Sequence, residues 1–201
     1  IFLINKLSQT GGLKTQGIFR LSVPVSELDH AIVLLNLNDY SNTFFSQVLT
    51  SPHAYAVLLK RWFKILNDPI IPYSLYEDAL NIIRPPILKD ANYKQISVNE
   101  FMNKKLPQTN NLFLKYLIRF LKDEYTDENM LLNMMVVQNF ATILASTLIR
   151  SNQEDKAVDV DQLRLEISFI MTVFKQIDNL TKEEETWMTE AEKWFFENFC
   201  K

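Results

Sequence analysis

Cysteine is nearly absent from this sequence, since Cys200 is the only one in 201 residues. A single thiol excludes an internal disulfide framework, which is compatible with a reducing compartment, and we expect a cytoplasmic protein. Histidine is also scarce, with only His30 and His53. So few thiol and imidazole groups argue against a structural zinc site.

An excess of positive charge is missing as well. The chain has 21 basic and 24 acidic residues, which gives a formal net charge of -3. A global cationic surface that would attract nucleic acid or anionic lipid is therefore excluded, and any such contact would need a local patch. We expect no nucleic-acid partner.

The common catalytic signatures are missing too. The sequence contains no GxxxxGK, GxGxxG, HExxH, GxSxG or CxxC pattern, which removes the usual signs of phosphate loops, dinucleotide sites, zinc peptidases, serine hydrolases and dithiol enzymes. His30 and His53 have no evident nucleophile beside them. The acidic residues 183–185 are simply interpreted as the solvated first turn of a helix.

One stretch lacks charge altogether. Residues 130–149 are twenty in number and contain no Asp, Glu, Lys or Arg, which is long enough for a membrane span. The amides of Asn133, Gln138 and Asn139 lie within it, and amides are costly in lipid. We therefore predict one helix buried at the centre of a helical bundle and no transmembrane segment.

Helical periodicity dominates the rest of the chain, and the hydrophobic content of 47% is enough for a substantial core. We predict an all-α, multi-helix bundle. The capping boxes that begin at Ser74, Ser97 and Thr181 mark three helix starts. The predicted helices cover residues 1–9, 24–36, 53–66, 74–84, 97–106, 109–125, 130–149, 161–179 and 181–201. The loops are expected mainly at 10–22 and 151–158.

The domain prediction has two parts. Residues 1–180 are expected to form one helical domain, and 181–201 an additional helix that packs on it. Because the chain opens within a helix and without an initiator Met, we expect it to be a piece of a longer protein.

Two helices have an amphipathic pattern that predicts which side chains are buried. In the helix from His53 to Leu66, Lys60 and Lys64 are four residues apart and share a polar face. The apolar stripe of that helix is expected to contain Tyr55, Leu58, Leu59, Trp62, Ile65 and Leu66. In the last helix the inner face is expected to contain Met188, Ala191, Phe195 and Phe199, with Trp187 and Trp194 flanking it.

Glycine is rare, and its three copies are concentrated before one arginine. Gly11 and Gly12 precede the segment Gly17-Ile18-Phe19-Arg20, so the unusual backbone freedom of the chain surrounds Arg20 in a predicted loop. Arg20 could simply be solvated or pair with a surface carboxylate. Likewise, Lys60 and Lys64 could simply lie on the solvated face of their helix, and Asn139 could donate a hydrogen bond to a buried carbonyl oxygen.

Taken in order, these segments resemble the Rho GTPase-activating protein (RhoGAP) domain family. Gly17-Ile18-Phe19-Arg20 with Ser22 is similar to the arginine-finger loop of the family. The matching motifs further along the chain are Leu58-Leu59-Lys60, Lys64, Leu66, Pro69-Ile70-Ile71-Pro72, Leu106-Pro107-Gln108-Thr109-Asn110, Leu114, Leu117, Asn133, Met135, Asn139, Ala141, Thr147, Leu148 and Arg150. The resemblance covers roughly residues 1–180.

The resemblance implies a domain that binds a GTP-loaded Rho-family GTPase and inserts Arg20 into the nucleotide site. It further implies that Lys60 and Asn139 bind the switch regions of the GTPase and help to hold the finger loop, with Lys64 in support. GTP and Mg²⁺ would be bound by the GTPase, so no cofactor of its own is expected. The domain would complete the partner's active site and would have no independent turnover.

Four positions depart from the family pattern. Val23 stands where Gly is usual, and Lys64 stands where Arg is usual, which keeps the charge but loses the bidentate fork. Leu144 and Ser146 replace an aromatic residue and Pro. Two alternatives therefore remain open at this stage: a weak or inactive module that serves as a GTPase-binding adaptor, and a helical scaffold without a GTPase partner.

Overall fold

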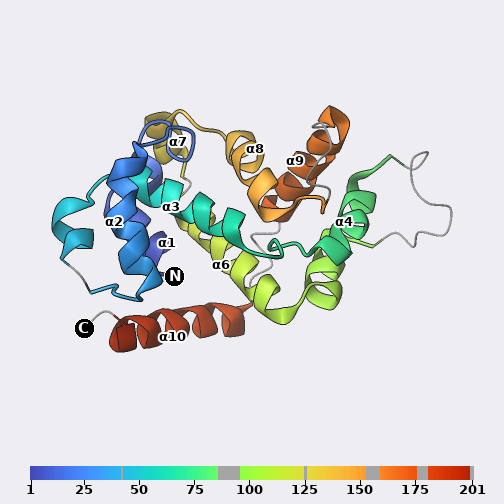
Figure 1. Cartoon of the computed structure of the whole chain (residues 1–201). Coiled ribbons are helices and arrows are strands. Elements are labelled where there is room, and N and C mark those ends of the chain that lie inside the picture. Colours follow the sequence, from blue (N-terminus) through green and yellow to red (C-terminus); the bar gives the residue numbers. More distant parts are fainter. Residues whose placement is uncertain (42, 86–95, 125, 153–158, 176–180, 200–201) are drawn as a thin grey trace. The chain divides into compact units, whose positions relative to one another are not determined.

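The computed structural model describes residues 1–41, 43–85, 96–124, 126–152, 159–175 and 181–199. Within these ranges every regular element is helical and no strand occurs, so the all-α prediction is confirmed (Figure 1). In chain order the elements are α1 (Phe2–Gln9), the 3-10 turn η1 (Gly12–Lys14), α2 (Val25–Asn36), the π-helical turn η2 (Phe44–Val48), α3 (Pro52–Ile65), η3 (Tyr73–Leu75), α4 (Tyr76–Ile83), α5 (Val98–Glu100), η5 (Phe101–Lys105), α6 (Gln108–Glu124), α7 (Asp127–Asn133), α8 (Val137–Leu148), α9 (Val160–Phe174) and α10 (Lys182–Phe199).

The chain divides into two compact units. The first consists of Ile1–Trp62, Phe120–Met135 and Leu180–Lys201, and the second of Phe63–Arg119 and Val136–Asn179. Each unit has its own set of fully buried apolar side chains. Helix α10 belongs to the first unit. The expected single domain over 1–180 with a further helix at 181–201 stays a prediction.

Aromatic side chains form much of the core of the first unit. The ring of Phe2 lies 5.1 Å from that of Tyr40 and 5.0 Å from that of Phe45. The hydroxyl oxygen of Tyr55, on α3, lies 2.7 Å from the carbonyl oxygens of both Phe45 and Leu49. Burial raises the pKa of Tyr55 to about 12. These contacts hold the π-helical turn η2 against α3.

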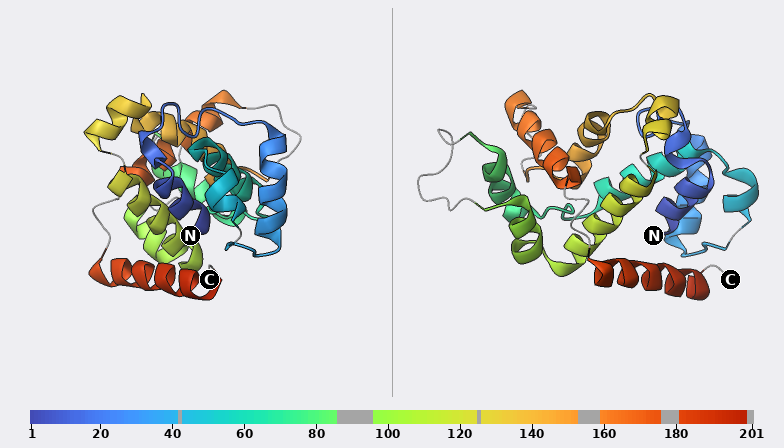
Figure 2. Two further views of the ribbon diagram at one scale, coloured as in Figure 1. Left: turned by 90° about the vertical axis from the view of Figure 1, so that its left-hand side faces the viewer. Right: turned by 180° about the vertical axis from the view of Figure 1, so that it is seen from behind.

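The second unit is built around α9, which packs against α8 and α4 (Figure 2). The fully buried rings of Phe101 and Phe169 meet edge to face, with their centroids 5.6 Å apart. Such pairs add about 0.5–1.5 kcal/mol to the stabilisation that burial alone provides.

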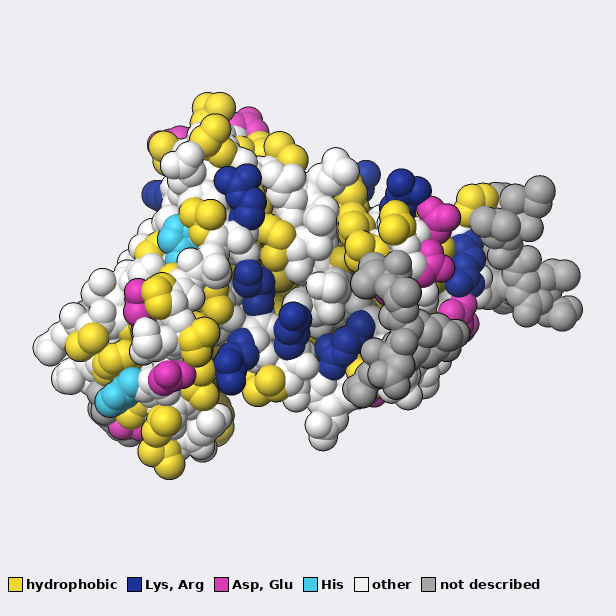
Figure 3. Space-filling view, turned by 45° about the horizontal axis from the view of Figure 1, so that its top comes forward, with side chains coloured by type: hydrophobic (Ala, Val, Ile, Leu, Met, Phe, Trp, Pro, Cys, Tyr) yellow, Lys and Arg dark blue, Asp and Glu magenta, His cyan; other side chains and the backbone are white. Residues whose placement is uncertain are grey.

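Some apolar side chains remain at the surface, as the yellow atoms in Figure 3 show. Trp62 is 39% exposed and Ile65 is 64% exposed, so the predicted apolar stripe of α3 was wrong at both positions. Phe63, which is fully buried, takes their place. Phe199, predicted to be buried on α10, is also exposed, whereas Met188 is fully buried as predicted.

The predicted helix over 130–149 was also wrong. The chain forms α7 and α8 instead, because Met134 adopts a left-handed conformation with φ of 55° that ends α7. The side-chain oxygen of Asn133 accepts a hydrogen bond from the backbone N–H of Met135 at 2.7 Å and stabilises this break. Among the described residues no single helix meets the length and hydropathy of a membrane span, and only α7 and α8 taken together across their break reach them.

The three predicted capping boxes had different outcomes. Ser97 accepts from the N–H of Glu100 at 3.0 Å, and Thr181 and Glu184 form the complete reciprocal pair, at 3.2 and 3.0 Å. The box at Ser74 was wrong, because Ser74 lies inside η3 and α4 begins one residue after Leu75. The predicted helix ends at Tyr125 and Asn179 and most of the 151–158 loop lie outside the described residues.

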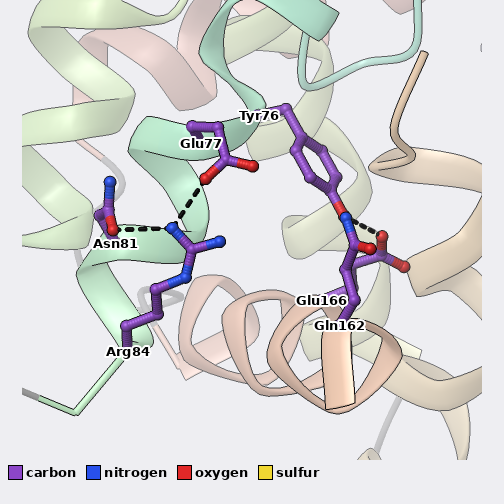
Figure 4. A network of polar contacts seen from close by, with 6 residues as sticks. All are labelled: Tyr76, Glu77, Asn81, Arg84, Gln162 and Glu166. Atoms are coloured by element: carbon purple, nitrogen blue, oxygen red, sulfur yellow. Dashed lines mark hydrogen bonds and ion pairs between the residues drawn. The ribbon is translucent and has the colours of Figure 1, made fainter. Parts of the chain in front are cut away.

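A buried polar network joins α4 to α9 in the second unit (Figure 4). The hydroxyl of Tyr76 donates to a carboxylate oxygen of Glu166, and the amide of Gln162 donates to the same hydroxyl at 2.7 Å. Burial raises the pKa of the Glu166 carboxyl, and burial together with Glu166 raises the pKa of Tyr76. At the end of α4, the guanidinium of Arg84 donates to the exposed carboxylate of Glu77 at 2.7 Å and to the buried amide oxygen of Asn81 at 2.9 Å.

Candidate functional site

The loop that carries Arg20 is a tight turn built on Gly17. The N–H groups of Arg20 and Leu21 both donate to the carbonyl oxygen of Gly17 at 3.0 Å. Gly17 has a φ of 67°, in the left-handed region that side chains disfavour. A Cβ atom at this position would lie 3.0 Å from the Cγ of Leu21, so glycine is required by both conformation and space.

The two residues before Arg20 anchor the loop in the first unit. Ile18 and Phe19 are fully buried, and burial of such side chains stabilises a fold by about 1.5–3 kcal/mol each. Phe19 nevertheless has a φ of 64°, a conformation that is strained for a bulky residue. The packing of its ring therefore holds a backbone conformation that the segment would not adopt alone.

Lys60 fixes the same backbone from α3. Its Nζ atom donates a hydrogen bond to the carbonyl oxygen of Phe19, the residue directly before Arg20. The side chain of Lys60 is only partly exposed, and a charged donor makes a stronger hydrogen bond than a neutral one. The structure thus brings Lys60 to the loop of Arg20.

Asn133, at the end of α7, is a second anchor; the sequence placed it among the family motifs but did not predict that it holds the Arg20 loop. It is fully buried. Its side-chain NH₂ donates to the carbonyl oxygen of Leu13, and its backbone carbonyl oxygen accepts a hydrogen bond from the N–H of Gly17 at 2.9 Å. Asn133 therefore ties both ends of residues 13–17 to α7. The available signal was an amide inside a largely apolar run, but we interpreted that run as one helix.

The guanidinium of Arg20 lies beside its own loop, with one nitrogen 3.5 Å from the position that a Cβ atom of Gly17 would occupy. Arg20 is exposed, and in the described part of the chain its guanidinium forms no hydrogen bond or ion pair. The alternative that Arg20 pairs with a surface carboxylate therefore has no support among the described residues. A planar cation with five N–H donors, exposed on a fixed backbone, is suited to binding phosphate oxygens of another molecule.

Lys64 lies in the last turn of α3, in the part assigned to the second unit, and is exposed. Arg150 holds the end of this helix, because its guanidinium contacts the carbonyl oxygens of Leu66 at 2.6 Å and Phe63 at 3.4 Å. The same guanidinium also lies over the ring of Tyr73, with its Cζ atom 5.7 Å from the ring centroid. Arg150 therefore has a structural role at the terminus that carries Lys64.

Asn139 is the third residue of α8 and is half-buried in the second unit. Its backbone N–H donates to the carbonyl oxygen of Val136 at 2.8 Å in the first turn. Of the four predicted site residues, Arg20 and Lys60 thus share the first unit, whereas Lys64 and Asn139 belong to the second.

The part of the chain that the structure describes contains no candidate metal-binding site. No group of three or more His, Cys, Asp or Glu side chains lies close enough there to hold a metal ion. The chemistry available at the loop is therefore that of fixed positive charge and backbone or amide hydrogen bonds.

Comparison with known proteins gives a consistent result. The chain is 28% identical over 181 residues to GTPase activating protein homolog 4 of Dictyostelium discoideum, covering 89% of this chain and 18% of that protein. It is 33% identical over 150 residues to Rho GTPase-activating protein 24 of Homo sapiens, covering 72% of this chain and 18% of that protein. The chain thus spans less than a fifth of the length of these relatives.

Two solved structures share the fold. The crystal structure of human Rho GTPase activating protein 15 superposes with a TM-score of 0.67 at 20% identity, covering 87% of this chain and 80% of that one. The BH domain from Graf, the GTPase regulator associated with focal adhesion kinase, gives a TM-score of 0.65 at 17% identity, covering 88% and 91%.

The sequence model of the RhoGAP domain matches residues 2–153, a span that contains the Arg20 loop, α3, α7 and α8. This span is well over half of the chain. The helical fold and the fixed, exposed arginine agree with the match, and the chain belongs to the RhoGAP domain family.

Proposed function

We propose that this domain is a GTPase-activating module for a Rho-family small GTPase in its GTP-bound state, with Arg20 as the arginine finger. The observation that carries the proposal is the contrast between the exposed guanidinium of Arg20 and the immobilised backbone beside it. Ile18 and Phe19 are buried, and the carbonyl of Phe19 is bound by Lys60. Because such a loop is already ordered, it loses little conformational entropy when it presents its cation to a partner.

Phosphoryl transfer explains why an arginine is suited to this task. Negative charge spreads over the transferred phosphoryl group and the leaving oxygen, and a planar guanidinium can donate to both. An arginine finger accelerates hydrolysis by roughly 10³ to 10⁵, which corresponds to about 4–7 kcal/mol of transition-state stabilisation. The GTPase would bind GTP and Mg²⁺ and orient the attacking water, and the domain would have no turnover of its own.

The other predicted residues would support this reaction. Lys60 would hold the finger loop and contact the switch regions of the GTPase, and Asn139 would bind those regions too. Lys64 would add a cation to the interface without the bidentate geometry of arginine. We place this activity in the cytoplasm, where GTP-loaded Rho-family proteins would be met.

The test is a single-turnover measurement of phosphate release. GTP-loaded Rho, Rac and related GTPases are mixed with the purified domain, with Arg20→Ala, and with Arg20→Lys, which keeps the charge but not the fork. We expect strong acceleration of at least one GTPase by the wild type, and loss of roughly 10³-fold or more in Arg20→Ala with binding retained. Arg164→Ala removes another exposed arginine, on α9, and should leave the rate unchanged.

The same assay decides between the alternatives. If no GTPase is accelerated but one binds in the presence of a non-hydrolysable GTP analogue, the domain is an adaptor, and Val23 in the finger loop is the first position to revert to Gly. If none binds, the GTPase proposal is wrong. If Arg20→Ala retains full activity, the assignment of the finger is wrong.

A further inference from the structure

A row of exposed tryptophan and glutamate side chains runs along α10, outside the Arg20 loop and beyond the residues matched by the family model. Its members are spaced alternately by four and three residues, so they lie on one face of the helix. They are Glu183, Trp187, Glu190, Trp194 and Glu197. We call this face the Trp–Glu stripe. Figure 1 shows α10 in dark red.

The inner face of α10 is already occupied, so the stripe is not a displaced core. Met188 is fully buried in the first unit, and the ring of Phe195 lies 5.1 Å from that of Tyr40. Residue 195 is one position beyond Trp194, which turns the tryptophan about 100° away from the buried side. The Trp–Glu stripe is therefore a second face of α10 that flanks the buried one.

The two tryptophans of the stripe expose unusually large apolar surfaces. Trp187 is 45% exposed and Trp194 is 59% exposed. Trp194 also packs edge to face against Phe199, which is itself exposed, with their centroids 5.6 Å apart. Tryptophan is enriched at the energetic centres of protein interfaces, and an exposed aromatic cluster of this kind favours association with a partner.

The charge of the stripe selects the partner. Glu183 and Glu190 form no ion pair within the described residues, and Glu197 is only loosely paired, with its oxygen 4.0 Å from the Nζ of Lys193. Carboxylates beside indole rings suit lysine and arginine, because these cations pair with the carboxylates and also bind over the faces of tryptophan. A second copy of α10 or an anionic membrane would bring like charges together.

The dimensions of the stripe indicate that its partner is helical. Its first and last residues are fourteen positions apart, which corresponds to about 21 Å along the axis, or four turns. The alternating spacing of four and three is that of helices packed side by side at a small crossing angle. We propose that the Trp–Glu stripe is a docking surface for a basic amphipathic helix of a partner protein, with its apolar residues on the two tryptophans and its cations on the three glutamates.

A defined peptide tests this proposal with the intact domain. The probe is a fluorescein-labelled, 18-residue amphipathic helix in which Leu occupies the inner heptad positions and Lys the flanking ones. Fluorescence anisotropy should report binding that weakens as salt rises from about 50 to 300 mM. The same peptide with Glu in place of Lys should not bind. The wavelength of the intrinsic tryptophan fluorescence of the domain should shift when the basic peptide is added.

Variants assign the binding to the stripe. Trp187→Ala with Trp194→Ala should weaken binding by at least about tenfold, and Glu183→Gln, Glu190→Gln and Glu197→Gln together by at least about threefold. Glu185→Gln, an equally exposed glutamate on another side of α10, is the matched control and should bind normally. Circular dichroism and thermal unfolding of each variant show that α10 remains folded.

Several results would overturn the proposal. These are no binding of the basic peptide, equal binding of the anionic peptide, or unchanged binding by the double tryptophan variant. Sedimentation equilibrium that shows self-association abolished by that variant would assign the stripe to a second copy instead. Binding to phosphatidylserine vesicles abolished by it would assign the stripe to a membrane. Because Arg20 is not involved, GTPase activation should be the same in all these variants whether or not the peptide binds.

Discussion

Removal of the Asn133 side chain should destabilise the domain and loosen the loop that carries Arg20 at the same time. In Asn133→Ala the buried carbonyl of Leu13 loses its side-chain donor, and the N–H of Met135 loses its side-chain acceptor. Each buried group left without its partner costs about 1–3 kcal/mol. We therefore expect the free energy of unfolding to fall by about 2–6 kcal/mol.

Urea unfolding followed by far-UV circular dichroism measures this loss. Asn36→Ala is the matched control, because Asn36 is an exposed amide near the end of α2 in the same unit, and its loss should change stability by less than about 0.5 kcal/mol. Asn133→Asp is a sharper test. It keeps the acceptor for Met135 but turns a carboxylate oxygen toward the carbonyl of Leu13, so it should be at least as destabilising as alanine.

The result that would refute this reasoning is a loss below about 1 kcal/mol in both Asn133 variants. The two side-chain bonds would then contribute little, and the loop would be held by the burial of Ile18 and Phe19 and by the remaining bonds from Lys60 and the Asn133 backbone. Phosphate release under folded conditions adds a second readout. Since Asn133 acts through the position of residues 13–17, the variants should lower the rate of GTP hydrolysis more than they lower binding of the GTPase.

Three further changes test the loop and the buried network. Gly17→Ala should lower stability by about 1–2 kcal/mol, because alanine is strained at a φ of 67° and its Cβ would crowd Leu21; unfolding in urea measures this, and an unchanged midpoint would mean that the turn rearranges freely. Lys60→Met keeps the apolar stem but removes the donor to Phe19, so GTPase acceleration should fall by about tenfold or more while the fold persists; an unchanged rate would remove Lys60 from the site. Burial raises the pKa of Glu166, so ionisation of this carboxyl opposes folding. The stability of the wild type should therefore fall as pH rises from the unfolded pKa of about 4.3 through the folded pKa. Glu166→Gln should gain stability relative to wild type between pH 5 and 8, and a relative loss over that range would contradict the assigned cause.

Features that depend on neighbouring residues could be predicted from the sequence. Ser97 and Thr181 cap their helices as the local pattern indicates, since a cap requires only a side-chain oxygen three residues before an N–H. The position of Arg20 in a glycine-rich turn was likewise evident. Hydrophobic periodicity also gave the approximate bounds of α2 and α3.

Features that depend on distant residues could not be predicted in this way. The break between α7 and α8 is made by Met134 in a conformation that its own sequence does not favour, and Asn133 compensates by bonds to Leu13, Gly17 and Met135. Periodicity likewise placed Trp62 inside and could not show that Phe63 fills the core instead. Motif order proposed Arg20 and Lys60 as candidate site residues, but only coordinates show that Lys60 binds the carbonyl of Phe19.

The bond between Asn133 and Leu13 also constrains the order in which the domain can assemble. The two residues are 120 positions apart in the sequence, and the entropic cost of closing so long a loop must be met before this contact stabilises the fold. During synthesis, the first unit would stay incomplete until both of its later segments, Phe120–Met135 and Leu180–Lys201, had followed. A nascent chain that ended before α7 would therefore carry Arg20 on a loop that lacks its bonds to Asn133, and these bonds could form only after α7 had been made.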